Sequence, residues 1–421
     1  MISKSKQNEI FVWIWLPGKK EPVVAGKLTK IKKRVLFTYG KSYLDNPKAL
    51  PIYDKELPLQ GGVQEKSFGI EAMPGCIRDA APDAWGRRVI LNKLLGVKGK
   101  IADPGDLDEF TYLMESGSDR IGGLDFQKSS KIYEPRLAGQ ASLEELLHSA
   151  EQIEKGIPLT PELAQAINHG TSIGGARPKA LIHDHNTKYI AKFSSSTDQY
   201  NVIKAEFISM RLAKLCGLNV ANVKLANASG KDVLLIVRFD REFKDGGWDR
   251  KLMLSALTLL DLDEMTPHYA SYEDLAELVR HRFTNPKATL KEIFGRIVFN
   301  ILCGNTDDHA RNHAAFWDGK HLTITPAYDI CPQMRHGGEA SQAMMISGKD
   351  RSSRLVTCLA TANRFMLNEA EARHIIDAQV SAIKESWDEA CDAADLSLID
   401  KTLFKERLFL NSYAFEGYSA K

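Results

Sequence analysis

Short apolar runs rich in aromatic and β-branched residues occupy the N-terminal part of the chain. Residues 9–17, 21–30 and 34–40 are runs of this kind, separated by glycine, proline and lysine turns, and they predict β-strands. The pattern becomes helical over residues 82–96 and 106–116, and a glycine stands at the end of each segment. The sequence therefore predicts an α+β unit at the N-terminus.

A break in the pattern separates this unit from the rest of the chain. Residues 141–156 predict an amphipathic helix that begins behind Ser142, with Glu145 completing a capping box. Pro158 and Pro161 follow this helix, and we expect a domain boundary near them because prolines interrupt regular structure.

Beyond the break, a strand and a helix carry two charged residues of interest. In the strand 188–193, alternation places Lys192 on the same face as Ile190. A lysine on a buried face needs a partner such as phosphate, whereas a lysine on an edge strand is solvated. The helix 202–216 carries Glu206, for which pairing with Lys192 and a surface position are both open. The apolar stripe of this helix consists of Phe207, Ile208, Leu212 and Leu215.

The C-terminal half is predicted to be mostly helical after a strand over residues 231–241. Residues 272–283 and 291–304 carry helical patterns. The second of these helices is expected to be buried, because its apolar residues form a continuous stripe, and it leads directly into residues 305–312. A further helix is predicted after Asn368, with core residues Ile376, Val380, Ile383 and Trp387.

Length and composition are those of an ordinary globular protein. The chain has 421 residues, 43% apolar and 26% charged, which suits about two or three packed units. A net charge of +2 gives no global basic field for nucleic acid. The six cysteines lie far apart without a CxxC pair, so neither a zinc site nor a disulfide framework is expected. With no signal peptide or membrane span predicted, we expect a soluble, cytoplasmic protein.

The candidate chemistry lies in residues 304–329. Asp307 is followed five residues on by Asn312, and Asp329 closes a strand-like run after a short loop. Metal-assisted phosphoryl transfer uses a carboxylate that accepts the proton of the substrate hydroxyl, an amide oxygen on Mg²⁺ and a later carboxylate on the metal. The alternative interpretation is a polar turn in which these side chains cap backbone groups.

A glycine-rich loop precedes the strand that holds Lys192. Gly170, Gly174 and Gly175 can drape backbone N–H groups over phosphates, as the glycine-rich loop of kinases does. The loop lacks the GxxxxGK[ST] pattern of a Walker A motif. By itself, such a glycine turn is also consistent with a hairpin.

In this order, the motifs resemble those of the HipA family of bacterial serine/threonine kinases, the toxin halves of HipBA-type toxin–antitoxin systems. The resemblance covers nearly the whole chain and rests on LPLQ (57–60), PDAWGRRVI (82–90), SDRIGGLDF (118–126), SIGGARPKA (172–180), IVRFDR (236–241), GNTDDHARN (304–312) and TPAYDI (325–330). It implies an α+β, kinase-like two-lobed fold with a β-rich N-terminal subdomain and a mostly helical C-terminal lobe. The implied parts are that subdomain over 1–125, a linker helix with the N-lobe-like nucleotide-binding part over 126–240, and the C-terminal lobe over 241–421.

The resemblance also implies roles for individual residues. Asp307 would accept the proton, Asn312 and Asp329 would hold Mg²⁺, and Lys192 would contact the ATP phosphates. Ser172 falls at the loop serine that relatives autophosphorylate, and the added negative charge expels the loop and inactivates the kinase. The implied ATP-binding residues are Gly174, Gly175, Ala176, Arg177, Pro178, Lys179, Lys192, Val237, Arg238, Phe239, His309, Ala310, Arg311, Asn312, Tyr328 and Asp329.

Two positions depart from the family pattern. Arg311 stands where the family commonly has lysine, which keeps the positive charge but changes the donor geometry near the γ-phosphate. Val237 replaces an acidic residue seen in relatives, so only its backbone can serve the adenine.

The function implied by the resemblance is that of an ATP-dependent protein serine/threonine kinase toxin. Its expected target is an aminoacyl-tRNA synthetase, such as glutamyl-tRNA synthetase, whose inhibition would stop translation and promote growth arrest and persistence. Its expected partner is a small helix-turn-helix antitoxin of the HipB type, which binds operator DNA and recruits the kinase to it. Two alternatives stay open: a catalytically weak corepressor that stabilises the antitoxin on DNA, and a kinase of a small metabolite.

Overall fold

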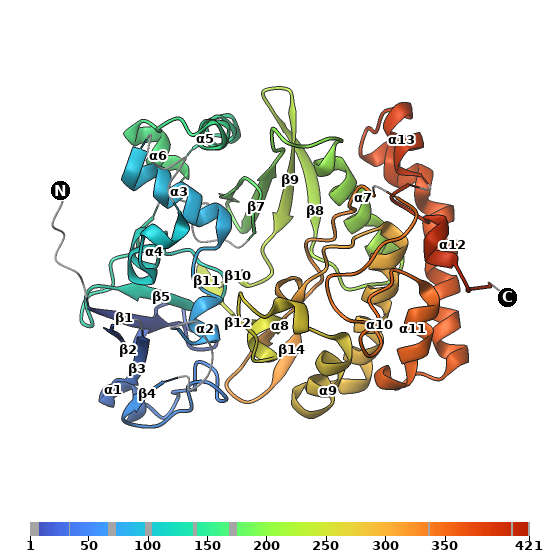
Figure 1. Cartoon of the computed structure of the whole chain (residues 1–421). Coiled ribbons are helices and arrows are strands. Elements are labelled where there is room, and N and C mark those ends of the chain that lie inside the picture. The colour runs from blue at the N-terminus through green and yellow to red at the C-terminus, as the bar shows by residue number, and fades with distance from the viewer. Residues whose placement is uncertain are drawn as a thin grey trace.

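The computed structural model describes residues 8–32, 34–65, 73–96, 103–137, 141–167, 175–335, 337–405 and 407–419. The chain runs from a β-rich part at the N-terminus, through a second sheet, to a helical part at the C-terminus, and the two termini lie at opposite ends (Figure 1). Among the described segments, no helix combines the length and the apolar character needed to cross a membrane.

The N-terminal part is built on a five-stranded antiparallel sheet with the order β4-β3-β2-β1-β5. The expected strands are confirmed, and the apolar side chains of Ile10, Val12 and Ile14 alternate onto one fully buried face. The strands are β1 (Glu9–Ile14), β2 (Val23–Ile31), β3 (Arg34–Tyr39), β4 (Val63–Gln64) and β5 (Leu124–Gln127).

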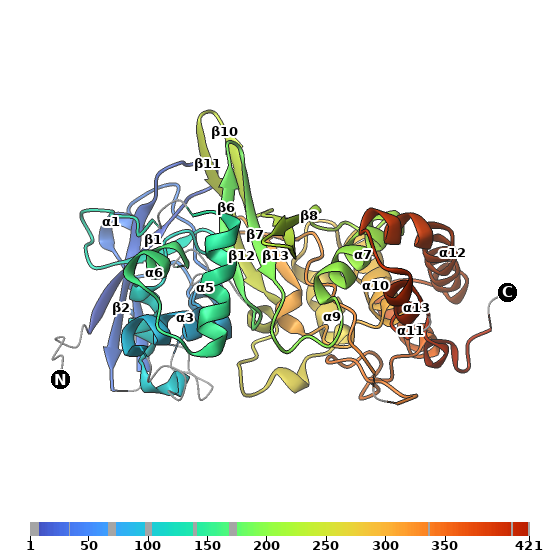
Figure 2. The same ribbon diagram turned by 90° about the horizontal axis from the view of Figure 1, so that it is seen from above.

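Six helices precede the second sheet in the chain, and the first four of them lie between strands of the first sheet. The capping box of Ser142 and Glu145 is present, and Gly156 ends the same helix in the left-handed conformation. In Figures 1 and 2, α3, α5 and α6 lie close together beside the second sheet. The helices are α1 (Lys41–Leu44), α2 (Gly75–Arg78), α3 (Ala84–Leu95), α4 (Glu109–Glu115), α5 (Leu143–Lys155) and α6 (Pro161–Ile167).

The second sheet is four-stranded and antiparallel, with the order β6-β7-β9-β8, and it is buried on both faces. Phe193 and Leu235 pack with Trp85 and α5 on one face, while Leu234 and Ile236 join the core around α7 on the other. The strands are β6 (Lys179–Asp184), β7 (Thr187–Phe193), β8 (Val223–Ala228) and β9 (Lys231–Val237), and the helix is α7 (Val202–Leu215).

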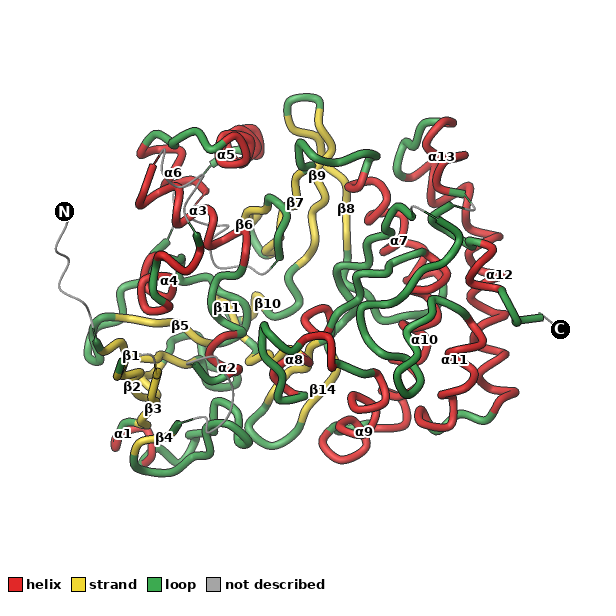
Figure 3. Tube along the Cα trace, viewed as in Figure 1, coloured by secondary structure: helices red, strands yellow, loops and turns green. Residues whose placement is uncertain are grey.

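The C-terminal part is organised around α10, whose predicted apolar stripe is buried throughout. Between α10 and α11, the described residues form short strands, loops, turns and a short 3-10 helix over Ala310–Asn312 (Figure 3). The helices are α8 (Ala256–Leu259), α9 (Tyr272–Arg282), α10 (Pro286–Cys303), α11 (Leu355–Thr361), α12 (Glu369–Ala393) and α13 (Leu398–Phe404). The remaining strands are β10 (Arg241–Lys244), β11 (Gly247–Arg250), β12 (Leu252–Ser255), β13 (Ala314–Trp317) and β14 (Leu322–Ile324).

Candidate active site

The loop that carries the candidate catalytic residues leaves the end of α10. Gly304 ends this helix with a φ of 72°, a left-handed conformation that suits glycine. The buried side chain of Asn305 then donates to Oδ1 of Asn300 at 3.0 Å. The loop therefore starts from a rigid helix and is anchored to it within one residue.

Two adjacent aspartates in this loop have different environments. Asp308 is buried, and its carboxylate accepts from the Tyr272 hydroxyl, from Nδ2 of Asn300 at 2.7 Å and from Nε2 of His313 at 2.8 Å. Burial opposes ionisation of Asp308, but His313 and these hydrogen bonds outweigh it and hold its pKa below the usual range. Asp307 is exposed and is the carboxylate left for chemistry.

Asp307 has the protonation behaviour of a proton acceptor. Desolvation raises its pKa, His309 opposes this, and the carboxylates of Asp329 and Asp308 raise it further. A carboxylate that holds a proton more tightly than usual is a better general base. The backbone carbonyl of Asp307 also accepts from Nδ2 of Asn312 at 3.3 Å, which places these two residues side by side.

Lys192 lies in the interior between β7 and α7. Its Nζ atom is 2.6 Å from Oε1 of Glu206, and it also binds the carboxylate of Asp329. Of the two positions left open for Glu206, the pairing with Lys192 is the one observed, and the surface position is wrong because this residue is only 1% exposed. Burial would lower the pKa of Lys192, but the nearby carboxylates of Asp329 and Glu206 outweigh burial, so the pKa of Lys192 is raised. The lysine is therefore charged.

Asp329 reaches this lysine from the loop after β14. Its backbone has a φ of 60°, a left-handed conformation that is uncommon outside glycine and concentrates at functional sites. The preceding Tyr328 donates its hydroxyl to the carbonyl of Arg311 at 2.6 Å, which ties the segment to the catalytic loop. Burial would raise the pKa of Asp329, but Lys192 outweighs it and lowers it. Asp307, Asn312, Asp329 and Lys192 are thus brought together from three segments.

The glycine-rich loop is described only from Gly175 onward, so Ser172 and Gly174 lie outside the described residues. Its described part is attached to the start of α3. The carboxylate of Asp83 accepts from the N–H of Gly175, and the two N–H groups of Trp85 donate to the carbonyls of Gly175, at 3.1 Å, and Lys179, at 2.9 Å. The side chain of Lys179 is itself buried.

Asp83 and Trp85 were missed as site residues by the sequence analysis. The motif PDAWGRRVI had been noted there only as the start of a helix and as part of the family resemblance. Burial raises the pKa of Asp83 to about 6, although Lys179 and Arg311 act in the opposite direction. The N-terminal part therefore contributes a carboxyl group to the surroundings of the glycine-rich loop.

Other implied nucleotide residues have partners that limit their roles. Arg177 pairs with Asp198 at 2.7 Å, and Arg311 forms an ion pair with Glu264. The side chain of Arg238 is buried among carboxylates, and its N–H donates to the carbonyl of Lys188 at 2.8 Å. The guanidinium of Arg238 is therefore engaged within the protein.

Several groups fit a bound nucleotide and metal. Nδ1 of His309 is buried and lacks a hydrogen-bond partner among the described residues, as expected of a group that waits for a phosphate oxygen. Within the described ranges, no three His, Cys, Asp or Glu side chains converge to hold a metal. The hard donors here are the Asp329 carboxylate and the Asn312 amide oxygen, which suit Mg²⁺ completed by water and phosphate oxygens.

The family models decide the identity of the fold. A model described as "HipA-like C-terminal domain" matches residues 171–387, just over half of the chain, and one described as "HipA N-terminal domain" matches residues 14–127. The chain belongs to the HipA family. The earlier resemblance is confirmed, and the two matched ranges lie on the two halves of the structure.

Curated relatives of this chain are named as kinases. "Putative kinase Y4mE" of Sinorhizobium fredii is 25% identical over 369 residues, which cover 80% of each protein. "Serine/threonine-protein kinase toxin HipA" of Shewanella oneidensis is 27% identical over 184 residues, which cover 38% of this chain and 42% of that protein. Together with the family, these names identify the chain as a kinase.

A solved structure confirms the HipA-like fold. The HipA chain in the complex of Shewanella oneidensis HipA, HipB and operator DNA superposes with a TM-score of 0.66 and covers 97% of this chain and 96% of its own length. The sequence identity is 20%, so the match concerns the fold. The expected kinase-like architecture, β-rich at the N-terminus and helical at the C-terminus, is the one observed.

Proposed function

We propose that this HipA-family chain is an ATP-dependent protein serine/threonine kinase and the toxin component of a type II toxin–antitoxin system. The observation that carries the proposal is the buried contact of Lys192 with Glu206 and Asp329. Active protein kinases need a strand lysine paired with a helix glutamate and a metal-binding aspartate close by. A chain that only recruited an antitoxin to DNA would have no use for this arrangement.

The side chains take the following roles. Asp307 accepts the proton of the substrate hydroxyl, since it is the exposed carboxylate of the loop and its pKa is raised. Lys192, Lys179 and His309 contact phosphate oxygens of ATP. Asn312 and Asp329 hold Mg²⁺, and the backbone of Val237 to Phe239 meets the adenine. When bound, Mg²⁺-ATP supplies the phosphoryl group and neutralises its charge.

Ser172 is proposed as the site of self-inactivation. It lies three residues before Gly175, whose N–H and carbonyl are both tied to α3. A phosphate on Ser172 would add about two negative charges beside the binding site of the ATP phosphates, and the repulsion would expel the loop.

The proposed partner is a helix-turn-helix antitoxin of the HipB type, through which the kinase would be brought to operator DNA. The solved structure of similar fold is that of a HipA with HipB and operator DNA, which supports this partner. The proposed target is an aminoacyl-tRNA synthetase, with glutamyl-tRNA synthetase as the first candidate. The proposed division of the chain is 1–125, 126–240 and 241–421.

The test is phosphate transfer by the full-length protein with Mg²⁺ and ATP, mapped by mass spectrometry. Asp307→Asn serves as the inactive control. We expect phosphate on Ser172 and on a synthetase, but none with the variant. If phosphate were transferred only to small metabolites, the chain would be a metabolite kinase and not a protein kinase. If a protein that carries no phosphate on Ser172 transferred no phosphate at all, the corepressor function would be favoured.

A further inference from the structure

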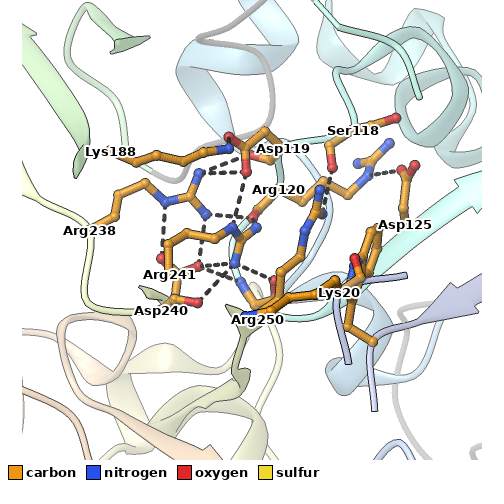
Figure 4. Close-up of polar contacts among 12 residues, drawn as sticks. Lys20, Ser118, Asp119, Arg120, Asp125, Lys188, Arg238, Asp240, Arg241 and Arg250 are labelled. Carbon is orange, nitrogen blue, oxygen red and sulfur yellow. Dashed lines mark hydrogen bonds and ion pairs between the residues drawn. The ribbon is translucent and has the colours of Figure 1, made fainter. Parts of the chain in front are cut away.

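A network of ion pairs joins the N-terminal part of the chain to the segment that begins at the end of β9. We call residues 236–241 the interlobe segment, because they connect the second sheet to the C-terminal part. In Figure 4, the side chains of Lys188, Arg238 and Arg241 converge on Asp119. Asp119 lies between α4 and β5, 69 positions before Lys188 and more than a hundred before Arg238 and Arg241.

Arg238 is held on both sides of its guanidinium. Towards its own segment, Nε and Nη2 donate to the two carboxylate oxygens of Asp240 at 3.0 and 2.8 Å. Towards the N-terminal part, Nη1 donates to the carbonyl of Asp119 at 3.1 Å and Nη2 to that of Arg120 at 2.7 Å. This forked geometry fixes orientation as well as distance.

Gly122 adds two further hydrogen bonds between the same two segments. Asp240 accepts from the N–H of Gly122 at 2.8 Å, and Nη1 of Arg241 donates to the carbonyl of Gly122 at 2.8 Å. The backbone of residues 119–122 is therefore bonded to side chains of the interlobe segment at several points. A shift of either segment would break more than one bond.

Asp119 is the member shared by three cations, one on β7 and two in the interlobe segment. Its carboxylate lies 3.1 Å from Nη1 of Arg238 and 3.1 Å from Nε of Arg241, and it also binds Nζ of Lys188 on β7. The backbone carbonyl of Lys188 also accepts a hydrogen bond from the N–H of Arg238. β7 and the interlobe segment are therefore bonded to each other as well as to the carboxylate of Asp119. Burial opposes the charge of Asp119, but Arg238 and Arg241 outweigh it and hold its pKa well below the usual range.

Stability alone is a weak reason for this arrangement. Burying Arg238, Asp240 and Arg241 and half-burying Asp119 and Lys188 costs desolvation energy that well-packed apolar side chains would avoid, whereas a geometry fixed by many directed bonds favours specificity. The segment held in this way contains Val237 to Phe239, which the proposed function places at the adenine. A binding site keeps its affinity only when its supporting residues hold it within a fraction of an ångström.

We propose that Asp119 is a positioning residue for nucleotide binding, which sets the interlobe segment where its backbone meets the adenine. The N-terminal subdomain then forms part of the kinase's nucleotide site through Asp119, without touching the nucleotide. This inference rests on the proposed function, because it assigns the adenine to the interlobe segment.

Asp119→Asn is the test, and Asp125→Asn is its matched control. Asp125 is fully buried and is paired with Arg120 and Arg136 at 2.9 Å each, so its loss also unpairs one buried and one half-buried cation, but both lie outside the interlobe segment. The measurements are the Kd of a fluorescent ATP analogue, KM for ATP and kcat, the melting temperature, and hydrogen exchange over residues 236–241.

We expect Asp119→Asn to weaken nucleotide binding about tenfold, with kcat at saturating ATP reduced much less, and to speed exchange in the interlobe segment. Asp125→Asn should lower the melting temperature while leaving Kd within about twofold of the wild type. Equal effects of the two variants on Kd, or an unchanged Kd in Asp119→Asn, would overturn the inference.

A second variant keeps the test sharp if Asp119→Asn does not fold. Arg241→Lys preserves the positive charge but loses the forked donors that reach Gly122 and Asp119. The same increase in Kd is expected, and an unchanged Kd would again contradict the inference. A wild type that binds ATP but transfers no phosphate would refute the proposed function alone, since nucleotide binding is measured independently of transfer.

Discussion

Nζ of Lys192 lies 2.6 Å from Oε1 of Glu206, in the interior between β7 and α7. The strand residue and the helix residue are both almost fully buried, and Asp329 completes the set from a third segment. The ammonium of Lys192 therefore faces two carboxylates, and Lys179 also helps to keep the pKa of Asp329 low. This relationship ties the position of Lys192 to α7.

Replacing Glu206 should damage catalysis without removing any group that touches the substrate. Glu206→Gln keeps the shape of the side chain but removes the charge that holds Lys192, so the lysine is expected to move towards Asp329. We expect kcat/KM for ATP to fall tenfold or more, about 1.4 kcal/mol of transition-state stabilisation at least. Glu277→Gln, at an exposed residue of α9 that contacts His281, is the control. Equal activity of the two variants would contradict the role of Glu206.

The adjacent carboxylates Asp307 and Asp308 should separate catalysis from stability. Asp307→Asn should abolish phosphate transfer and change the free energy of unfolding by less than about 0.5 kcal/mol, because the side chain is exposed. Asp308→Asn should cost about 2–4 kcal/mol, because it removes the buried charge that pairs with His313. Urea denaturation and a phosphate-transfer assay on both variants check this, and a stable, inactive Asp308→Asn would reverse the assignment.

Asp83 should make stability depend on pH in the absence of nucleotide and metal. Its pKa is raised by burial from 3.8 to about 6 in the folded state, so the folded state holds this proton more tightly than the unfolded state. That contribution is complete below about pH 4 and is lost as the pH rises through about 6. Asp83→Asn keeps an acceptor for Gly175 but cannot ionise.

We therefore expect Asp83→Asn to gain stability relative to the wild type between pH 4 and 7, by about 3 kcal/mol at most. Urea denaturation of both proteins over this range measures the difference, in which the other titrating groups cancel. A difference that does not change with pH would show that Asp83 is ionised in the folded protein.

Gly304 should resist substitution more than a second glycine that follows a helix. A Cβ at Gly304 would lie 2.6 Å from the carbonyl oxygen of Leu408, and its φ of 72° is unfavourable for other residues. Gly217 has a φ of 81° but no atom within 4 Å of the added Cβ. We expect Gly217→Ala to cost about 1 kcal/mol and Gly304→Ala clearly more, since a backbone clash is added. Equal losses of unfolding free energy in Gly304→Ala and Gly217→Ala would show that the predicted backbone clash at position 304 does not occur.

Local structure and the order of the motifs could be predicted from the sequence. The strands of the N-terminal part, the capping box at Ser142 and the buried stripe of α10 followed from periodicity and from capping chemistry, and all are present. The family could also be named from the motifs, because their types and spacing are properties of the chain itself. The assigned roles of Ser172 and of the Mg²⁺ ligands stay predictions.

What the sequence determined by itself is the set of elements and the residues with chemistry to offer, since hydrophobic period and side-chain type act over a few neighbouring positions. Whether the face of β7 that carries Lys192 is covered, and hence whether this lysine meets Glu206 or water, was decided by the packing of α7. The same is true of Asp83 beside Gly175 and of Asp119 beside Arg238. These contacts join residues far apart in the chain, and only the packing of whole elements brings such residues together.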